Sequence, residues 1–219
     1  MGDRSKARWS LALNVVIAVM TTFAWFQMAL GWAGRGAALS AMGIYSLRYF
    51  TVLSNLFSGF TSLAVVVWTL RHRGERLPDG LHLLRYVATT SVALTLVTVE
   101  VYLAPAFGFG SMHAGANLWF HLLLPLFAIV GLCAFEADRP LTLRASLVAV
   151  VPMIVYGAGY LANILINGMG EWPNTNDWYG FTAWGLERAP IVFVIMALVT
   201  WLIALALRAI NQRVYRSSL

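Results

Sequence analysis

The sequence predicts an all-α fold, a polytopic membrane bundle of six transmembrane helices with both termini in the cytoplasm. Three observations predict it: 60% of the residues are hydrophobic, only 11% are charged, and the mean hydropathy is +0.73. A soluble domain carries about 25% charged residues, which keep its surface in water. Because this chain has less than half that supply, lipid is expected to surround most of it.

Six apolar runs are long enough to be membrane spans, since a helix needs about 20 residues to cross about 30 Å of hydrocarbon. They occupy residues 9–32, 45–70, 83–106, 117–135, 145–166 and 190–210. Short polar or Gly- and Pro-rich segments separate the runs. The longest, residues 167–180, has the Gly, Pro, Asn and Asp content of turns. We therefore expect residues 1–219 to form a single six-helix transmembrane domain.

The first run resembles a signal peptide in one respect, because Arg4, Lys6 and Arg8 precede it. Its apolar core is longer than the 7–15 residues, roughly, of a secretory signal. We therefore expect it to be kept as the first helix.

Basic residues set the expected orientation, because short cytoplasmic loops carry an excess of Lys and Arg. Twelve of the 15 basic residues fall on one side of the alternating helices and three on the other. The first set is Arg4, Lys6, Arg8, Arg71, Arg73, Arg76, Arg85, Arg139, Arg144, Arg208, Arg213 and Arg216, and the second is Arg35, Arg48 and Arg188. The first side, with both termini, is expected to be cytoplasmic. The Arg-rich, Lys-poor and Ala-rich composition favours a bacterial inner membrane.

Several partner and cofactor classes are not expected. The net charge of +6 lies in short segments between apolar runs, which indicates topology signals and no nucleic-acid partner. The single cysteine, Cys133, rules out an intrachain disulfide. No HxxxH or HExxH pair supports a metal site, and no Gly-rich phosphate loop follows a strand. We expect no cofactor and no metal, and the oligomeric state stays open.

Polar residues recur at one depth, in the outer third of the predicted membrane, and all six helices contribute. The inner half is expected to hold far fewer, chiefly Asn14 and hydroxyl groups. Arg48, Thr51 and Asn55 follow an i, i+3, i+7 spacing, which places them on one face of the second predicted helix. The layer comprises Gln27, Arg48, Thr51, Asn55, Glu100, Asn117, His121, Asn163, Asn167, Glu187 and Arg188. Such a layer is typical of a membrane-embedded pocket, although Asn and Thr also bond helix to helix.

A hydroxyl and an imidazole in this layer predict acyl-transfer chemistry. Thr51 is a weak nucleophile until a base removes its proton, and His121, with an ordinary pKa near 6.5, suits that role. Glu100 or Asn117 could orient the imidazole, and the sequence does not choose between them. Donors to a developing oxyanion, or substrate-binding groups, could come from Asn55, Asn163 and Arg48. Pro125, one turn after His121, predicts a local kink that opens a pocket.

Two segments resemble a known family. RYFTVLSNLF, residues 48–57, resembles the aromatic-Phe-Thr-x-x-Ser-Asn pattern of bacterial Pr6Pr-type membrane proteins, distant relatives of the androgen-induced, FAR-17a-like proteins of animals. NLWFHLLLPLFAIVGLCAFE, residues 117–136, resembles that family's Asn-x-x-x-His-x-x-x-Pro helix, which ends in an acidic residue. The family commonly carries Tyr-Pro-Phe before the last helix, where this chain has DWYGF, residues 177–181.

The resemblance implies a function. The animal relatives hydrolyse fatty acid esters of hydroxy fatty acids with a membrane Thr as nucleophile and a His, roles that fall on Thr51 and His121. A lipid or fatty-acyl ester would then enter from the bilayer. The alternative from a different class is a proton-coupled transporter or solute-binding protein that uses Glu100, His121 and Arg48. A membrane scaffold without catalysis is the third hypothesis.

Overall fold

The computed structural model describes residues 3–30, 43–72, 75–171, 175–182 and 185–217, and every regular element in these residues is a helix. Six helical segments are long and apolar enough to cross a membrane: Ser5–Ala29, Phe50–Arg71, Asp79–Phe107, Ala116–Phe135, Leu143–Asn167 and Leu186–Arg216. Each overlaps one predicted run, so the prediction of six apolar spans is confirmed. The predicted end of the first run at Trp32, and the basic residues Arg35 and Arg73, lie outside the described residues.

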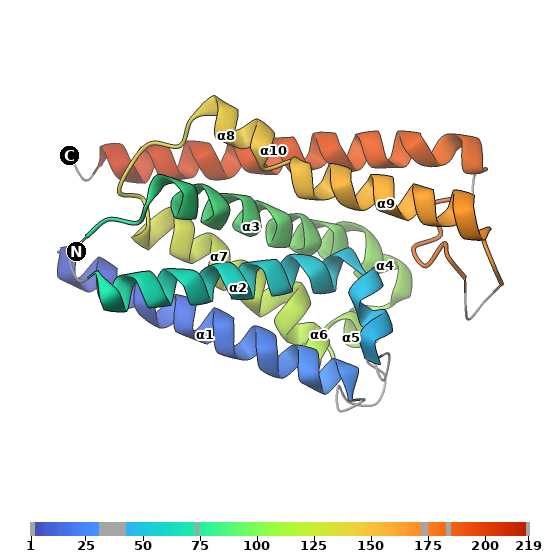
Figure 1. The fold of residues 1–219 in the computed structure, drawn as a ribbon, viewed down its shortest axis with the longest axis horizontal. Coiled ribbons are helices and arrows are strands. Elements are labelled where there is room, and N and C mark those ends of the chain that lie inside the picture. The colour runs from blue at the N-terminus through green and yellow to red at the C-terminus, as the bar shows by residue number, and fades with distance from the viewer. Residues whose placement is uncertain (1–2, 31–42, 73–74, 172–174, 183–184, 218–219) are drawn as a thin grey trace.

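The helices form three layers (Figure 1). α1 and α2 make one layer, α3 and α7 the middle layer, and α9 and α10 the third, while α1 begins and α10 ends at the same end of the bundle. The described elements are α1 (Asp3–Ala29), η1 (Gly43–Arg48), α2 (Phe50–Arg71), α3 (Asp79–Thr98), η2 (Val99–Leu103), α4 (Ala104–Phe107), α5 (Phe109–Met112), α6 (Ala116–Leu118), η3 (Trp119–Leu123), α7 (Leu124–Val130), η4 (Gly131–Phe135), α8 (Leu143–Val148), α9 (Val151–Asn167), η5 (Leu186–Arg188) and α10 (Ala189–Arg216).

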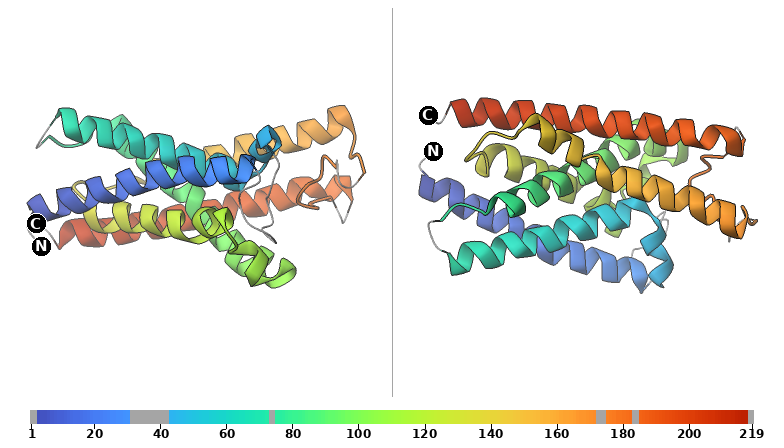
Figure 2. Two further views of the ribbon diagram at one scale, coloured as in Figure 1. Left: turned by 90° about the horizontal axis from the view of Figure 1, so that it is seen from below. Right: turned by 45° about the horizontal axis from the view of Figure 1, so that its top comes forward.

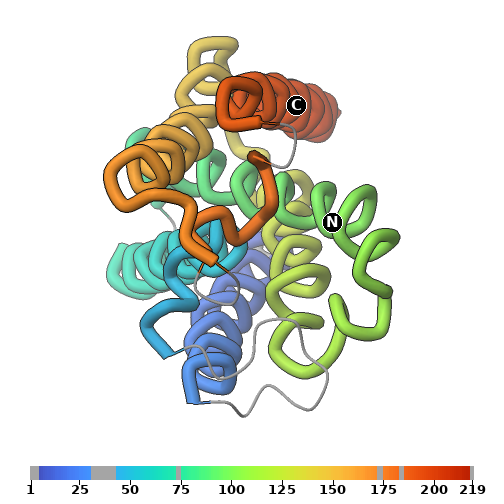
Figure 3. The backbone as a smooth tube through the Cα atoms, turned by 90° about the vertical axis from the view of Figure 1, so that its right-hand side faces the viewer, coloured from blue at the N-terminus to red at the C-terminus, as the bar shows by residue number. Residues whose placement is uncertain are grey.

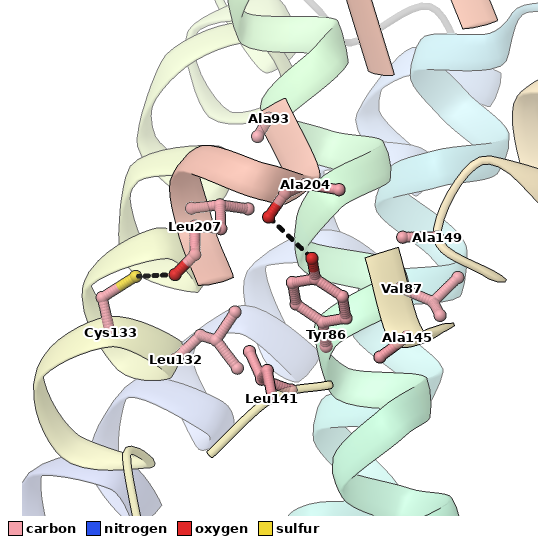
Figure 4. Packing of buried hydrophobic residues seen from close by; sticks show 10 residues of the cluster. All are labelled: Tyr86, Val87, Ala93, Leu132, Cys133, Leu141, Ala145, Ala149, Ala204 and Leu207. Atoms are coloured by element: carbon pink, nitrogen blue, oxygen red, sulfur yellow. Dashed lines mark hydrogen bonds between the residues drawn. The ribbon is translucent and has the colours of Figure 1, made fainter. Parts of the chain in front are cut away.

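α3 is the central helix and contacts α2, α7, α8, α9 and α10. Two of its buried hydroxyl groups bond within the helix: Thr89 donates to the carbonyl of Arg85 at 2.8 Å, and Thr90 to that of Tyr86 at 2.9 Å. The Tyr86 hydroxyl donates to the carbonyl of Ala204 on α10 at 2.6 Å (Figure 4). This bond fixes the outer helix to the core, and the long helices run side by side along the bundle (Figure 2).

Three π-helical turns, η2, η3 and η4, interrupt the third and fourth spans. Pro105 follows η2 and Pro125 follows η3. A proline has no N–H, so the carbonyl of His121, four residues before Pro125, loses its usual partner. The helix widens there instead, and the N–H of Leu124 bonds the carbonyl of Trp119 five residues back. The expected kink at Pro125 is thus a widened turn that contains His121.

A buried ion pair lies near the end of the bundle where α1 begins. Arg85 Nε donates to Glu136 Oε2 at 3.0 Å, with side-chain exposures of 0% and 3%. Ser10 and Asn14 donate to the other carboxylate oxygen at 3.0 and 2.6 Å. Gly131 makes room, because a Cβ there would lie 3.0 Å from Arg85 Nη2. Both nitrogens at the end of the guanidinium, Nη1 and Nη2, are buried without a described partner.

This pair concerns two expectations. Arg85 was assigned to the cytoplasmic basic residues, and the inner half was expected to hold chiefly Asn14 and hydroxyls. The structure begins α3 at Asp79, before the predicted start at residue 83, so Arg85 lies in the second turn of the helix and not at the start of the span. Its charge is then inside the bundle, where Glu136 compensates it. Hydropathy alone cannot separate a basic residue just inside a span from one just outside it.

The closest approach of α1 and α2 gives a first prediction. A Cβ added at Gly59 of α2 would lie 2.8 Å from Cγ2 of Thr21 on α1, so Gly59→Ala must push the helices apart. We expect a loss of about 1–3 kcal/mol in the free energy of unfolding. Thermal unfolding in detergent measures it, with Gly159→Ala as the control because nothing lies within 4 Å of that Cβ position. Equal melting temperatures for the two variants would contradict this packing.

Candidate active site

Thr51 is the second residue of α2, which begins at Phe50. The residue before the helix, Tyr49, has an extended backbone, with φ of −87° and ψ of 132°. The Thr51 side chain is buried, with a residue exposure of 6%. The backbone N–H groups of the first turn have partners in the protein, since Phe50 donates to Tyr179 and Val52 and Leu53 donate to the carbonyl of Tyr49, but the turn still carries the positive end of the helix dipole. An oxyanion that forms on or next to Thr51 would therefore be stabilised by the helix itself.

Arg48 lies before the helix and not on it. It ends the 3₁₀ turn η1, so the expected common face of Arg48, Thr51 and Asn55 is wrong for Arg48. The reason is the extended conformation of Tyr49, which breaks the helical spacing. The Arg48 guanidinium carbon lies 5.2 Å from the ring centroid of Tyr49 and 5.4 Å from that of Trp178. Arg48 therefore joins the start of α2 to the loop after α9.

Asn55 connects the nucleophile candidate to the histidine helix. Its side-chain nitrogen donates to the carbonyl of Thr51 at 2.8 Å and to the carbonyl of Phe120 at 3.0 Å. Phe120 precedes His121 in the chain, so one amide group holds the backbones of both candidate catalytic residues side by side. Both N–H groups of this amide are occupied, which makes Asn55 an orienting residue and leaves it no donor for an oxyanion.

His121 is 2% exposed, and its Nδ1 lies 2.5 Å from the carbonyl oxygen of Met112. A carbonyl only accepts, so this bond requires the hydrogen on Nδ1 and leaves Nε2 of the neutral ring as a proton acceptor. The sequence left the orienting group open between Glu100 and Asn117. In the structure the Met112 carbonyl takes that position, and the Asn117 side chain donates to the carbonyl of Ser111 at 3.3 Å.

Glu100 pairs with another histidine. Its Oε1 lies 2.7 Å from His113 Nε2, and His113 Nδ1 lies 2.9 Å from the carbonyl of Phe109. Both side chains are half-buried; Glu100 lies in the π-helical turn η2, and His113 directly follows α5. Asn163 is not brought into this group by a described hydrogen bond, because its Oδ1 accepts from Asn167 one turn further along α9, at 2.9 Å.

Thr51 lines a narrow apolar crevice of about 30 Å³ between α2, α3, α9 and α10. Its other lining residues are Phe50, Thr95, Thr98, Val99, Leu103, Met153, Tyr156, Tyr179, Phe181 and Met196. No hydrogen bond joins Thr51 to His121 in the part of the chain that the structure describes. Catalytic hydrogen bonds often reach their full strength only in the complex with substrate.

Tyr179 is a site residue that the sequence analysis did not single out. The loop after α9 folds back over the start of α2 (Figure 3), and the Tyr179 hydroxyl oxygen accepts from the backbone N–H of Phe50 at 3.1 Å. Its ring packs edge-on against Tyr49, with centroids 5.7 Å apart, and stacks on Phe181 at 5.0 Å. Burial raises the pKa of Tyr179 to about 12, against the opposing effect of a hydrogen bond from the Thr51 side chain.

Asp177 holds this loop in shape. Its carboxylate accepts from the Tyr160 hydroxyl, from the Thr182 hydroxyl, and from the backbone N–H groups of Phe181 and Thr182 at 2.9 and 3.0 Å. Burial alone would raise the pKa of Asp177, but the hydrogen bonds from Thr182 and Tyr160 outweigh it and the pKa is lowered. The only sequence signal was the DWYGF segment, because an Asp shortly before a Gly favours a side-chain-supported turn.

Comparison of the chain with protein-family models, with curated proteins and with solved structures gave no match.

Proposed function

We propose that this protein is an intramembrane hydrolase of lipid esters, with Thr51 as the nucleophile and His121 as the base. The observation that carries the proposal is the position of Thr51. It is a buried hydroxyl in the first turn of a helix, on the wall of an apolar crevice. The amide of Asn55 supports the pairing, since it links the backbones of residues 51 and 120.

The proposed reaction has two halves. His121 Nε2 takes the hydroxyl proton of Thr51 as its oxygen bonds to the ester carbonyl carbon, and the carbonyl electron pair moves onto oxygen. The intermediate collapses, the bond to the alkoxy oxygen breaks, and the alcohol leaves with the proton from His121. Water then attacks the acyl-Thr51 ester with His121 again as base, releasing the fatty acid and restoring the hydroxyl.

The apolar lining of the crevice favours an apolar substrate, and its space of about 30 Å³ has to widen to admit an acyl chain. Most of its lining side chains are aliphatic or aromatic, and they come from helices that would lie in the hydrocarbon region. A fatty acid ester of a hydroxy fatty acid brings an apolar chain on the acyl side of its ester, as this crevice requires. The bilayer itself would supply such a substrate.

The proposal includes a location and an orientation. A multi-pass protein with this distribution of Lys and Arg would keep the end where α1 begins and α10 ends in the cytoplasm. A bacterial inner membrane is the proposed location. Thr51 and His121 would then lie in the outer half of the bilayer.

Covalent labelling tests the proposal. We expect a fluorophosphonate probe to modify the purified protein in detergent, with the added mass on the peptide that contains Thr51. Thr51→Val should abolish the label. Thr90→Val, which removes another buried threonine hydroxyl bonded to its own helix, should leave it. Labelling at another residue would argue against a threonine hydrolase. The same conclusion would follow if the folded protein took up no label after incubation with the probe.

A proton-coupled transporter is the second candidate, and one observation favours it. The Arg85–Glu136 pair places ionisable groups inside the half of the bundle opposite to His121 and Glu100. Ionisable residues inside a membrane protein are functional candidates by default. Proton flux in proteoliposomes that depends on a solute gradient, without ester hydrolysis, would support this candidate over the hydrolase.

A further inference from the structure

The Tyr179 hydroxyl contacts the first turn of α2, and Tyr179 lines the same crevice as Thr51. Its oxygen accepts the backbone N–H of Phe50, the residue directly before Thr51. The ring is held by its contacts with Tyr49 and Phe181. The loop that carries it is fixed by the four hydrogen bonds to Asp177. The hydroxyl is thus held in place by the fold before any substrate binds.

The phenolic hydrogen of Tyr179 is suited to donation. The oxygen already receives the Phe50 N–H, and a hydroxyl that accepts one hydrogen bond donates the next one more strongly. With the pKa raised to about 12 by burial, the phenol keeps its hydrogen throughout the neutral range. It can therefore donate to a substrate oxygen without itself becoming charged.

The other polar side chains near Thr51 are engaged elsewhere. The Tyr156 hydroxyl donates to the carbonyl of Arg48 at 2.8 Å and accepts from Trp178 Nε1 at 3.0 Å. The Thr95 hydroxyl bonds that of Ser54 at 3.0 Å, and the Asn55 amide is occupied as described above. The Tyr179 hydroxyl, by contrast, hydrogen-bonds the Thr51 side chain as well as the Tyr156 hydroxyl, so its hydrogen lies beside the proposed nucleophile.

We propose that Tyr179 is a catalytic residue that donates a hydrogen bond to the carbonyl oxygen of the substrate ester. This inference rests on the proposed hydrolase function. When the Thr51 oxygen bonds to the carbonyl carbon, the π electron pair moves to the carbonyl oxygen, and the Tyr179 O–H stabilises the resulting charge together with the positive end of α2. No proton is transferred from Tyr179; it stays on the phenol through both halves of the reaction.

The test is the kinetics of Tyr179→Phe, which keeps the ring and its packing but removes the hydroxyl. With a chromogenic fatty-acyl ester we expect kcat to fall about 10²–10³-fold, the range found when one oxyanion donor is removed, and KM to change little. Tyr86→Phe is the matched control. It also deletes a buried tyrosine hydroxyl, the one bonded to Ala204, and should lower the melting temperature while kcat is kept.

A second measurement covers the case in which Tyr179→Phe does not fold. Difluorotyrosine at position 179 keeps the hydroxyl but lowers the phenol pKa, so the alkaline limb of the kcat profile should move to lower pH. An unmoved profile, or full kcat in folded Tyr179→Phe, would overturn the role of Tyr179 while the wild type still hydrolyses the ester. An inert wild type would instead defeat the hydrolase proposal itself, which separates the two failures.

Discussion

Thr51→Ala is expected to reduce kcat for ester hydrolysis by about 10⁴-fold or more, which is the scale of loss when a hydrolase loses its nucleophile. The reason is that alanine removes the oxygen atom that would form the proposed acyl intermediate, while the crevice and its apolar lining are kept. His121→Ala should cost about as much, and the double variant hardly more, because nucleophile and base act as one unit.

The measurement is the initial rate of hydrolysis of a fatty acid ester of a hydroxy fatty acid by purified protein in detergent, with melting temperatures for each variant. Thr51→Ser is the control, since it keeps a hydroxyl at the same place and should keep measurable turnover. If folded Thr51→Ala retains the wild-type rate, the nucleophile lies elsewhere and the crevice has to be interpreted as a binding site.

Glu136→Ala is expected to destabilise the protein by about 3–5 kcal/mol, the range for breaking a buried ion pair by removing one partner. The substitution leaves the guanidinium of Arg85 buried without its carboxylate, and it also removes the acceptor of Ser10 and Asn14. Chemical or thermal unfolding in detergent would report the loss.

Two comparisons make this prediction specific. Replacing both partners, Arg85→Met with Glu136→Leu, should recover much of the stability, because no uncompensated charge remains. Glu187→Ala removes a carboxylate from the exposed pair with Arg188, whose side chains are 74% and 67% exposed, and should leave the melting temperature unchanged. Equal effects of Glu136→Ala and Glu187→Ala would show that the buried pair contributes nothing.

The six spans were predictable because hydropathy and length are properties of each segment by itself. The common depth of Thr51 and His121 was predicted, but the place of Thr51 at the start of a helix was not, because the second span was expected to begin at residue 45 and α2 begins at Phe50. The displacement of Arg48 from the face that carries Thr51 and Asn55 was not predictable, because the extended residue Tyr49 interrupts the helical period. A single break in φ and ψ rotates every residue before it away from the expected face.

Tertiary contacts decide the rest. No periodicity links residue 179 to residue 50, and the bond between them exists only because Asp177 folds the loop back over α2. The partner of Glu100 was equally hidden, since His113 lies in the connection between the third and fourth spans, where no helical period applies. Each π-helical turn of these spans adds a residue that a period of 3.6 does not anticipate.

The crevice beside Thr51 has a consequence for how the protein matures. Its walls come from α2 and α3 in the first half of the chain and from α9, the following loop and α10 in the last third. A ribosome that inserts helices one after another would deliver the threonine long before Tyr179 and Met196 arrive. The crevice can therefore close only when synthesis is nearly complete, and a nascent chain that stalls after its fourth helix would lie in the bilayer with the crevice unfinished.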